Sequence, residues 1–175
     1  RYFAIKDTDK STMERTPILE TINSIEDFRK VPAARLPELA AEMRQFMVEN
    51  VARCGGHLAS SLGAVEITIA MHRAFESPKD KIVFDVGHQS YAHKILTGRR
   101  EAFCTLRQEN GISGFPKREE SEHDHFNTGH ASTAISAALG IARAKPLPGG
   151  EGAGGAPVGA GALPGGPASD GLNDA

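Results

Sequence analysis

The sequence predicts an α/β fold, with a mainly parallel sheet flanked by helices and a disordered C-terminal tail. Three features lead to this prediction. Apolar residues recur at helical spacing over residues 36–53, a short apolar run over residues 81–86 has the composition of a strand, and glycine and proline accumulate after residue 145. A helix, a turn and then a continuous apolar strand are typical of a parallel sheet that is covered on both faces.

The N-terminal part of the chain begins with a polar segment and continues into the clearest helix. Residues 1–20 have no hydrophobic period and are expected to form an extended arm, followed by a short turn over residues 24–28. Residues 36–53 are expected to form an amphipathic helix that ends at Gly55 and Gly56, because glycine readily adopts the left-handed conformation of a helix C-cap. Its apolar residues are Leu36, Leu39, Met43, Phe46, Met47 and Val51.

Three further segments have the character of regular elements. Residues 60–75 are apolar nearly all round, which predicts a helix buried on most sides, although the β-branched stretch 65–69 is also compatible with a strand. Residues 81–86 are the best candidate strand and are followed by Gly87. A short helix is expected over residues 91–96, and a further helix is expected over residues 132–143, where an alanine-rich face would allow close packing against the sheet.

The C-terminal segment differs in composition from the rest of the chain. Ten of the 19 glycines and five of the 10 prolines lie between residues 146 and 175. Such a segment has too few large apolar side chains to offset the loss of backbone entropy on folding. We therefore expect an N-terminal arm at 1–20, a folded part at 21–144 and a Gly/Ala/Pro-rich tail at 145–175.

Charge and hydrophobicity exclude several classes of partner. The chain has a net charge of −2 and lacks the basic excess of a nucleic-acid binder, so no nucleic-acid partner is expected. No apolar run reaches the roughly 18 residues that a membrane-spanning helix needs. The two cysteines show no paired spacing, which favours a reducing compartment such as the cytoplasm.

Three Gly-His pairs are the strongest candidates for chemistry. Gly56-His57, Gly87-His88 and Gly129-His130 each lie at the boundary of a predicted element. Glycine allows a ligand to approach the backbone, and histidine can donate, accept or transfer a proton near neutral pH. His88 directly follows the predicted strand, where ligands bind in parallel sheets. The alternative is that each histidine is only a surface or capping residue.

Two other clusters have a functional and a structural interpretation. His123-Asp124-His125 resembles a pair of metal ligands, but a solvated charge run is the preferred interpretation, and no metal site is predicted. Lys94, Arg99 and Arg100 could bind a phosphate, although a solvated helix end is preferred. The phosphate-binding Walker loop, the dinucleotide-binding glycine pattern and the hydrolase Gly-x-Ser-x-Gly elbow are all absent from the sequence.

Five short blocks resemble the 1-deoxy-D-xylulose-5-phosphate synthase family in the same order. They are GGHLASSLG at 55–63, DVGHQSYAHKILTGRR at 85–100, GISGF at 111–115, ESEHD at 120–124 and GHAST at 129–133. The second block is the most specific, whereas the first would also suit a transketolase. The resemblance covers residues 17–144.

The resemblance implies an enzyme of the transketolase type that uses thiamine diphosphate and Mg²⁺. The reaction joins pyruvate to D-glyceraldehyde 3-phosphate with loss of CO₂, and is the first step of the non-mevalonate isoprenoid pathway. Residues 21–144 would be a partial thiamine-diphosphate-binding domain. His57 would be the catalytic residue, and the cofactor-binding residues would be His88, Gly129, His130 and Ala131. The complete enzyme is expected to be a cytoplasmic homodimer, with the plastid as an alternative location.

The resemblance is expected to end near Lys145. In the family, a strand, a Gly-Asp-Gly sequence and a later asparagine follow the alanine-rich helix and hold Mg²⁺. We expect those ligands to lie outside this chain, since the tail begins at that point and Asp170-Gly171 and Asn173 do not match the spacing. The chain is thus interpreted as an inactive fragment of the synthase. The alternatives are a truncated, catalytically inactive product or a fragment of a transketolase.

Overall fold

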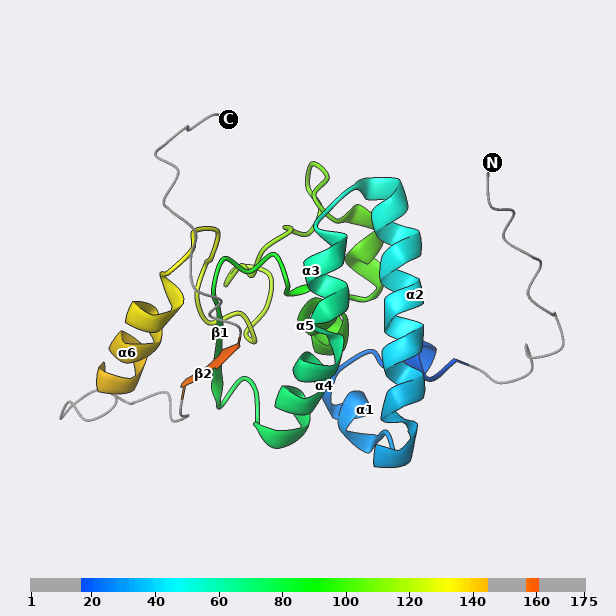
Figure 1. Ribbon diagram of the computed structural model, residues 1–175, viewed down its shortest axis with the longest axis horizontal. Helices are drawn as coiled ribbons and strands as arrows, with labels where there is room; N and C mark the ends of the chain where they lie inside the picture. Colours follow the sequence, from blue (N-terminus) through cyan, green and yellow to red (C-terminus); the bar gives the residue numbers. More distant parts are fainter. Residues whose placement is uncertain (1–16, 145–156, 161–175) are drawn as a thin grey trace, which may run out of the picture.

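The computed structural model describes residues 17–144 and 157–160. The expected arm up to residue 16 and the remainder of the predicted tail lie outside the described residues. A group of helices that includes α1 to α5 lies on one side of the strand pair β1–β2, and α6 lies on the other (Figure 1). The described elements, in chain order, are η2 (Ile18–Thr21), α1 (Ile25–Lys30), η3 (Ala33–Arg35), α2 (Leu36–Cys54), α3 (Leu58–Gly63), α4 (Val65–Ala74), β1 (Lys81–Phe84), α5 (Tyr91–Lys94), η4 (Ile95–Arg99), η5 (Glu101–Thr105), α6 (Ala134–Ala144) and β2 (Pro157–Ala160).

Helix α2 organises the main core, as its apolar period predicts. Leu39, Met43 and Met47 are completely buried on one face of the helix. The helix ends at Gly55, whose φ of 74° is the left-handed conformation that glycine adopts without strain. The expected boundaries at residues 36 and 53 are therefore confirmed to within one residue.

The segment 60–75 is helical but is divided into two helices. Ala64, with φ −100° and ψ 3°, separates α3 from α4. Glycine is a weak helix former, so Gly63 is a natural place for this break. The prediction of burial on most sides is wrong for part of α4, because Ile67 is 53% exposed.

Strands β1 and β2 form a parallel pair in which Lys81 lies opposite Pro157 and Phe84 opposite Ala160. The expectation of disorder is therefore wrong for residues 157–160. Composition alone misjudged this segment because β1 supplies the backbone partner and α6 packs beside it. Of the expected mainly parallel sheet, the described residues contain this one pair.

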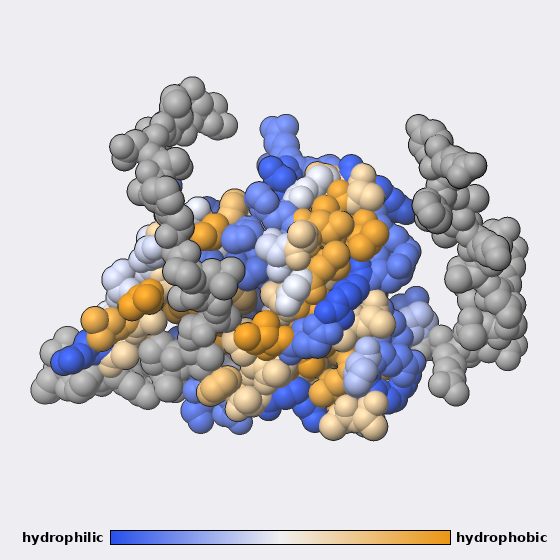
Figure 2. Space-filling view, viewed as in Figure 1, coloured by the Kyte–Doolittle hydropathy of each residue, from blue (hydrophilic) through white to orange (hydrophobic). Residues whose placement is uncertain are grey.

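Helix α6 contacts both strands but buries little of its own surface. Ala134 is buried, whereas Ile135 is 69% and Leu139 57% exposed. Figure 2 shows the resulting hydrophobic surface on this helix. Ala137, Ala138 and Ala142 are partly buried in this helix that contacts both strands, which agrees with the expected close packing of its alanine-rich face.

The start of the described chain also differs from the expected arm. Residues 18–21 form a 3-10 helix, and Ile18 and Leu19 are buried in the core beside α2. The Leu19 N–H donates to Glu42 of α2 at 2.7 Å, which fixes this turn on the helix. Across the described ranges, none of the helices is long and apolar enough to cross a membrane.

Candidate active site

A sharp turn follows β1 and carries His88. Val86 and Gly87 both have positive φ, at 61° and 94°. For a β-branched residue such as valine this conformation is strained, and strained turns of this kind concentrate at functional sites. A Cβ atom on Gly87 would lie 2.2 Å from Thr128 Oγ1 and 2.5 Å from Pro116 Cδ. Glycine is therefore required here.

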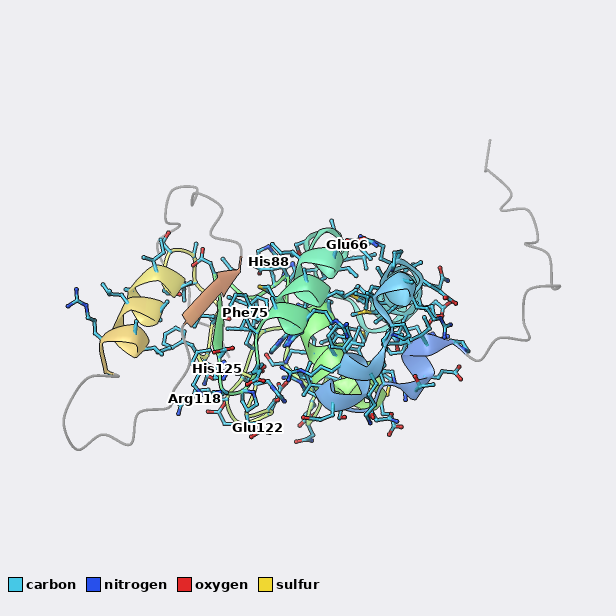
Figure 3. The ribbon with its side chains drawn as sticks, turned by 90° about the horizontal axis from the view of Figure 1, so that it is seen from below. Glu66, Phe75, His88, Arg118, Glu122 and His125 are labelled. Atoms are coloured by element: carbon cyan, nitrogen blue, oxygen red, sulfur yellow. The ribbon has the colours of Figure 1, made fainter. Side chains whose placement is uncertain are left out.

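His57 and His88 come together although they are 31 positions apart in the sequence. Their rings meet edge to face, with centroids 5.6 Å apart. His57 is the residue before α3, and His88 lies between the strand pair and helices α3 and α4 (Figure 3). The hydroxyls of Ser60 and Ser61 donate to the His88 carbonyl at 3.4 and 2.9 Å, so the start of α3 holds the turn after β1.

The His88 imidazole has an unused polar atom. Its Nδ1 is buried and has no hydrogen-bond partner among the described residues. Burial lowers the pKa of His88, and the nearby His57 lowers it further. A neutral imidazole with an unsatisfied nitrogen is suited to a hydrogen bond with a ligand.

Tyr91 holds the backbone of His57 by a hydrogen bond. The tyrosine is completely buried at the start of α5, and its hydroxyl accepts from the His57 N–H at 3.1 Å. Gly56 has a φ of 147°, and a Cβ atom there would lie 2.6 Å from this hydroxyl. The Gly-Gly-His turn is thus seated directly on Tyr91, while the His57 side chain is exposed.

Phe115 forms a further wall of the site, with its ring centroid 6.1 Å from that of His57. Sequence reasoning gave no role to Phe115 or Tyr91. Both residues lie in sequence blocks that match the family, at 85–100 and 111–115, and that match is the one sequence signal that points to them. Their contacts with His57 join segments distant in the sequence, and no local pattern predicts them.

The third Gly-His pair runs beside the same turn. Thr128 lies against Gly87, and the Ala134 N–H donates to Asp85 at 3.3 Å. Residues 129–131 therefore lie between two residues that contact the chain near the end of β1. Gly129, His130 and Ala131 are exposed. Among the described residues, the His130 ring makes no ring contact with His57 or His88.

The structure corrects both interpretations of the basic and acidic clusters. Lys94 and Arg99 are buried in ion pairs with Glu120 and Asp124, so they are neither a solvated helix end nor open to a phosphate. Asp124 is 4% exposed, which contradicts the solvated charge run. Within the described residues, no group of three or more His, Cys, Asp or Glu side chains could hold a metal ion.

Comparison with known proteins identifies the family. The model of the 1-deoxy-D-xylulose-5-phosphate synthase family matches residues 19–175. This chain belongs to that family. It is 59% identical over 158 residues to the 1-deoxy-D-xylulose-5-phosphate synthases of Anaeromyxobacter sp. (strain K) and Syntrophomonas wolfei, covering 90% of this chain and 25% of each relative. The synthase of Chromobacterium violaceum is 55% identical over 159 residues, covering 91% of this chain and 26% of the relative.

The chain spans about a quarter of the length of these curated synthases. The match to the family model also continues through the segment that was expected to depart from it. The prediction that the resemblance ends near Lys145 is therefore wrong. The high glycine and proline content of this segment led to that prediction, although strand β2 follows the alanine-rich helix as the family resemblance implies.

The synthase family implies thiamine diphosphate and Mg²⁺. The described residues suit the first of these groups better than the second. The free His88 Nδ1 and the glycine-lined turns offer a hydrogen bond and close backbone approach to thiamine diphosphate. For Mg²⁺ the described residues do not fit. Strand β2 ends at Ala160, and alanine offers no oxygen at the place where the family resemblance implies an aspartate between two glycines.

Proposed function

We propose that this chain provides the N-terminal part of the thiamine-diphosphate site of a 1-deoxy-D-xylulose-5-phosphate synthase. The reaction would join pyruvate to D-glyceraldehyde 3-phosphate with loss of CO₂. The observation that carries the proposal is the contact of His57 and His88 beyond the end of β1, where the buried Nδ1 atom of His88 has no hydrogen-bond partner in the part of the chain that the structure describes. Membership of the synthase family supports the choice of reaction.

Each site residue has a role that suits its environment. His57 is exposed on a backbone held by Tyr91, and it would orient the substrate or transfer a proton. His88 would donate to or accept from thiamine diphosphate through its free Nδ1. Gly129, His130 and Ala131, exposed near the start of α6, would contact the cofactor. Thiamine diphosphate supplies the carbanion chemistry when it is bound.

The remaining features of the proposal concern a larger assembly. We place β1 and β2 in a wider parallel sheet, with the site at the carboxyl ends of its strands, where ligands bind in open α/β folds. A homodimer in the bacterial cytoplasm is the corresponding proposal for the complete enzyme. The bacterial origin of the similar synthases supports this location.

A second candidate function is a non-catalytic chain of the same family. Ala160 at the end of β2 favours it, because Mg²⁺ needs oxygen ligands to hold a diphosphate. In this case the chain would keep the histidine pair without turning over substrate. The two candidates differ in whether thiamine diphosphate binds and whether Mg²⁺ matters.

Calorimetric titration with thiamine diphosphate, with and without Mg²⁺, tests the proposal. We expect binding that His88→Ala weakens about five- to thirtyfold, since a lost hydrogen bond in a buried site costs about 1–2 kcal/mol. Titration with thiamine, which lacks the diphosphate, is the control for the contribution of that group. Absence of heat from thiamine diphosphate under both conditions would reject the cofactor site and leave the non-catalytic chain.

A further inference from the structure

A cluster of buried charged and polar side chains lies behind the site and takes no part in the proposed function. It joins α4, the segment α5–η4 and the loop 113–124. The Lys94 side chain is 0% exposed, that of Arg99 8%, that of Asp124 0% and that of Glu120 17%. Burying several ionised groups is costly, and a buried ion pair is seldom more stabilising than apolar packing of the same volume. Stability alone is therefore a weak explanation of the cluster. Its members are His72, His93, Lys94, Arg99, Glu120 and Asp124.

The two carboxylates of this cluster hold both ends of one loop. Glu120 Oε1 accepts from the Ser113 N–H at 2.6 Å, and Asp124 Oδ2 accepts from the Lys117 N–H at 2.7 Å. These are backbone amides of a segment without regular structure, which would otherwise need another acceptor. The carboxylates thus fix residues 113–117 by two charge-assisted hydrogen bonds.

The cations keep the carboxylates in position. Arg99 donates to both oxygens of Asp124, at 2.7 and 2.9 Å, and to Glu120 Oε2 at 3.2 Å. Lys94 also donates to Glu120 Oε2. Each carboxylate therefore faces the cations and a loop amide simultaneously. Neither glutamine nor asparagine can reproduce this, because an amide group has one acceptor oxygen and one donor nitrogen.

Between the two anchored amides, the loop reaches the histidine site. Phe115 lies against His57, and Pro116 lies so close to Gly87 that a Cβ atom there would be 2.5 Å from its Cδ. Gly114 passes near Tyr91, the residue that holds the His57 backbone. The stretch between the carboxylate contacts thus lies against the His57 ring and against the backbone turn that carries His88.

We propose that Glu120 and Asp124 are positioning residues that hold the loop 113–117 as the wall of the His57–His88 site. Lys94 and Arg99 neutralise them in the interior. The importance of this wall for catalysis rests on the function proposed above, but its contacts with the His57 ring and with the turn at Gly87 do not. The ring of Phe115 is the group through which the carboxylates act on His57.

The variant Glu120→Gln tests this role, with Glu122→Gln as the matched control. Glu122 is exposed in the longer loop 113–124, at the edge of the molecule in Figure 3, and its substitution removes the same charge. The readout is the NMR spectrum of the histidine rings in the full chain, because the ring current of Phe115 acts on the His57 imidazole. We expect Glu120→Gln to shift the Ser113 amide and the His57 ring resonances, and Glu122→Gln to leave both in place.

A shift in melting temperature with unchanged His57 and His88 resonances would overturn the proposal, since the cluster would then be merely structural. Amide hydrogen exchange in the unsubstituted chain also tests the positioning role. This measurement does not depend on whether a variant folds. Ser113 and Lys117 should exchange at least about tenfold more slowly than exposed loop amides, as expected for hydrogen bonds to charged acceptors. Exchange at the unprotected rate would also overturn it. Neither readout needs a ligand, so failure of thiamine diphosphate to bind rejects only the proposed function.

Discussion

At the scale of single residues, the site depends on glycines that allow other groups to touch the backbone. Gly56 is seated on the Tyr91 hydroxyl, and Gly87 is enclosed by Thr128 and Pro116. In both places the backbone also has a positive φ. The Gly-His pairing in the sequence therefore has a steric origin at these two positions, beyond any role in admitting a ligand.

Replacing Gly87 by alanine should be strongly destabilising. The new methyl group would overlap Thr128 and Pro116, and the backbone would be strained at a φ of 94°, for a combined cost of about 3 kcal/mol. Gly129→Ala is the matched control, because no atom of the described residues lies within 4 Å of its Cβ position. Urea unfolding should separate the two variants clearly. Equal, small effects in both would contradict the close packing of the turn.

Residue identities in the site were predictable only in part. The Gly-His pairs indicated His57 and His88, because the chemistry of each pair is local in sequence. The role of Tyr91 was not predictable, since its contact with the His57 backbone joins residues 34 positions apart. Asp124 and Lys94 were assigned to the surface because charged residues usually lie there. Their burial depends on partners that only the tertiary fold supplies.

At the scale of elements, helices α4 and α5 are joined by a pair of buried histidines. The rings of His72 and His93 stack with centroids 5.0 Å apart. His93 Nε2 is hydrogen-bonded to Asp124 Oδ1 at 2.9 Å. Burial lowers the pKa of His93 to about 4 and that of His72 to about 2. Both rings are therefore neutral at pH 7, and the ordinary pKa of 6.5 applies to them only in the unfolded chain.

Acidification should destabilise the fold well above the range in which carboxylates titrate. Between pH 6.5 and 4 the unfolded chain binds protons at His72 and His93 while the folded chain does not, so the free energy of unfolding falls as the pH falls. The loss at pH 5 is about 2 kcal/mol for each histidine. Chemical unfolding followed from pH 7 to 5 measures it.

Two variants separate this effect from other titrations. His72→Gln should flatten the pH profile, whereas His130→Gln should preserve it because His130 is exposed. The lowered pKa values of His88, His123 and His125 act in the same direction and remain in both variants. A profile that is level down to pH 4 would show that the buried pair is not neutral in the fold.

Elements with a strong internal period were predictable, and elements that depend on a partner were not. Helix α2 follows from its apolar spacing and its terminal glycines. Strand β2 has a proline, a glycine and an alanine among its four residues, which gives it almost no strand propensity. Strand β2 forms because the backbone of β1 supplies its hydrogen-bond partners. The backbone of β1 has a further partner in His125, whose Nδ1 accepts from the Ile82 N–H at 3.1 Å.

At the scale of the whole molecule, the turn after β1 brings the candidate site to the carboxyl end of the parallel pair. Helices α3 and α5 hold the backbones of His88 and His57, the loop 113–117 places Phe115 against the His57 ring, and the start of α6 bonds to Asp85 at the same end. Strand β2 also ends here, since Ala160 is in register with Phe84. A substitution at residue 160 therefore alters the strand end beside the turn that leads to His88.

Introducing a carboxylate at this strand end should create a metal requirement. The family resemblance implies an aspartate between two glycines after this strand, and Ala160→Asp restores that sequence. We expect Mg²⁺ to increase the affinity of this variant for thiamine diphosphate at least about tenfold, because Mg²⁺ is held by carboxylate oxygens together with phosphate oxygens. Ala160→Asn is the control of similar size without the charge, and its dependence on Mg²⁺ should be weaker. Titration of both variants with and without Mg²⁺ gives the comparison. If Ala160→Asp binds thiamine diphosphate equally well in the two conditions, the end of β2 is not the place where this chain departs from its catalytic relatives.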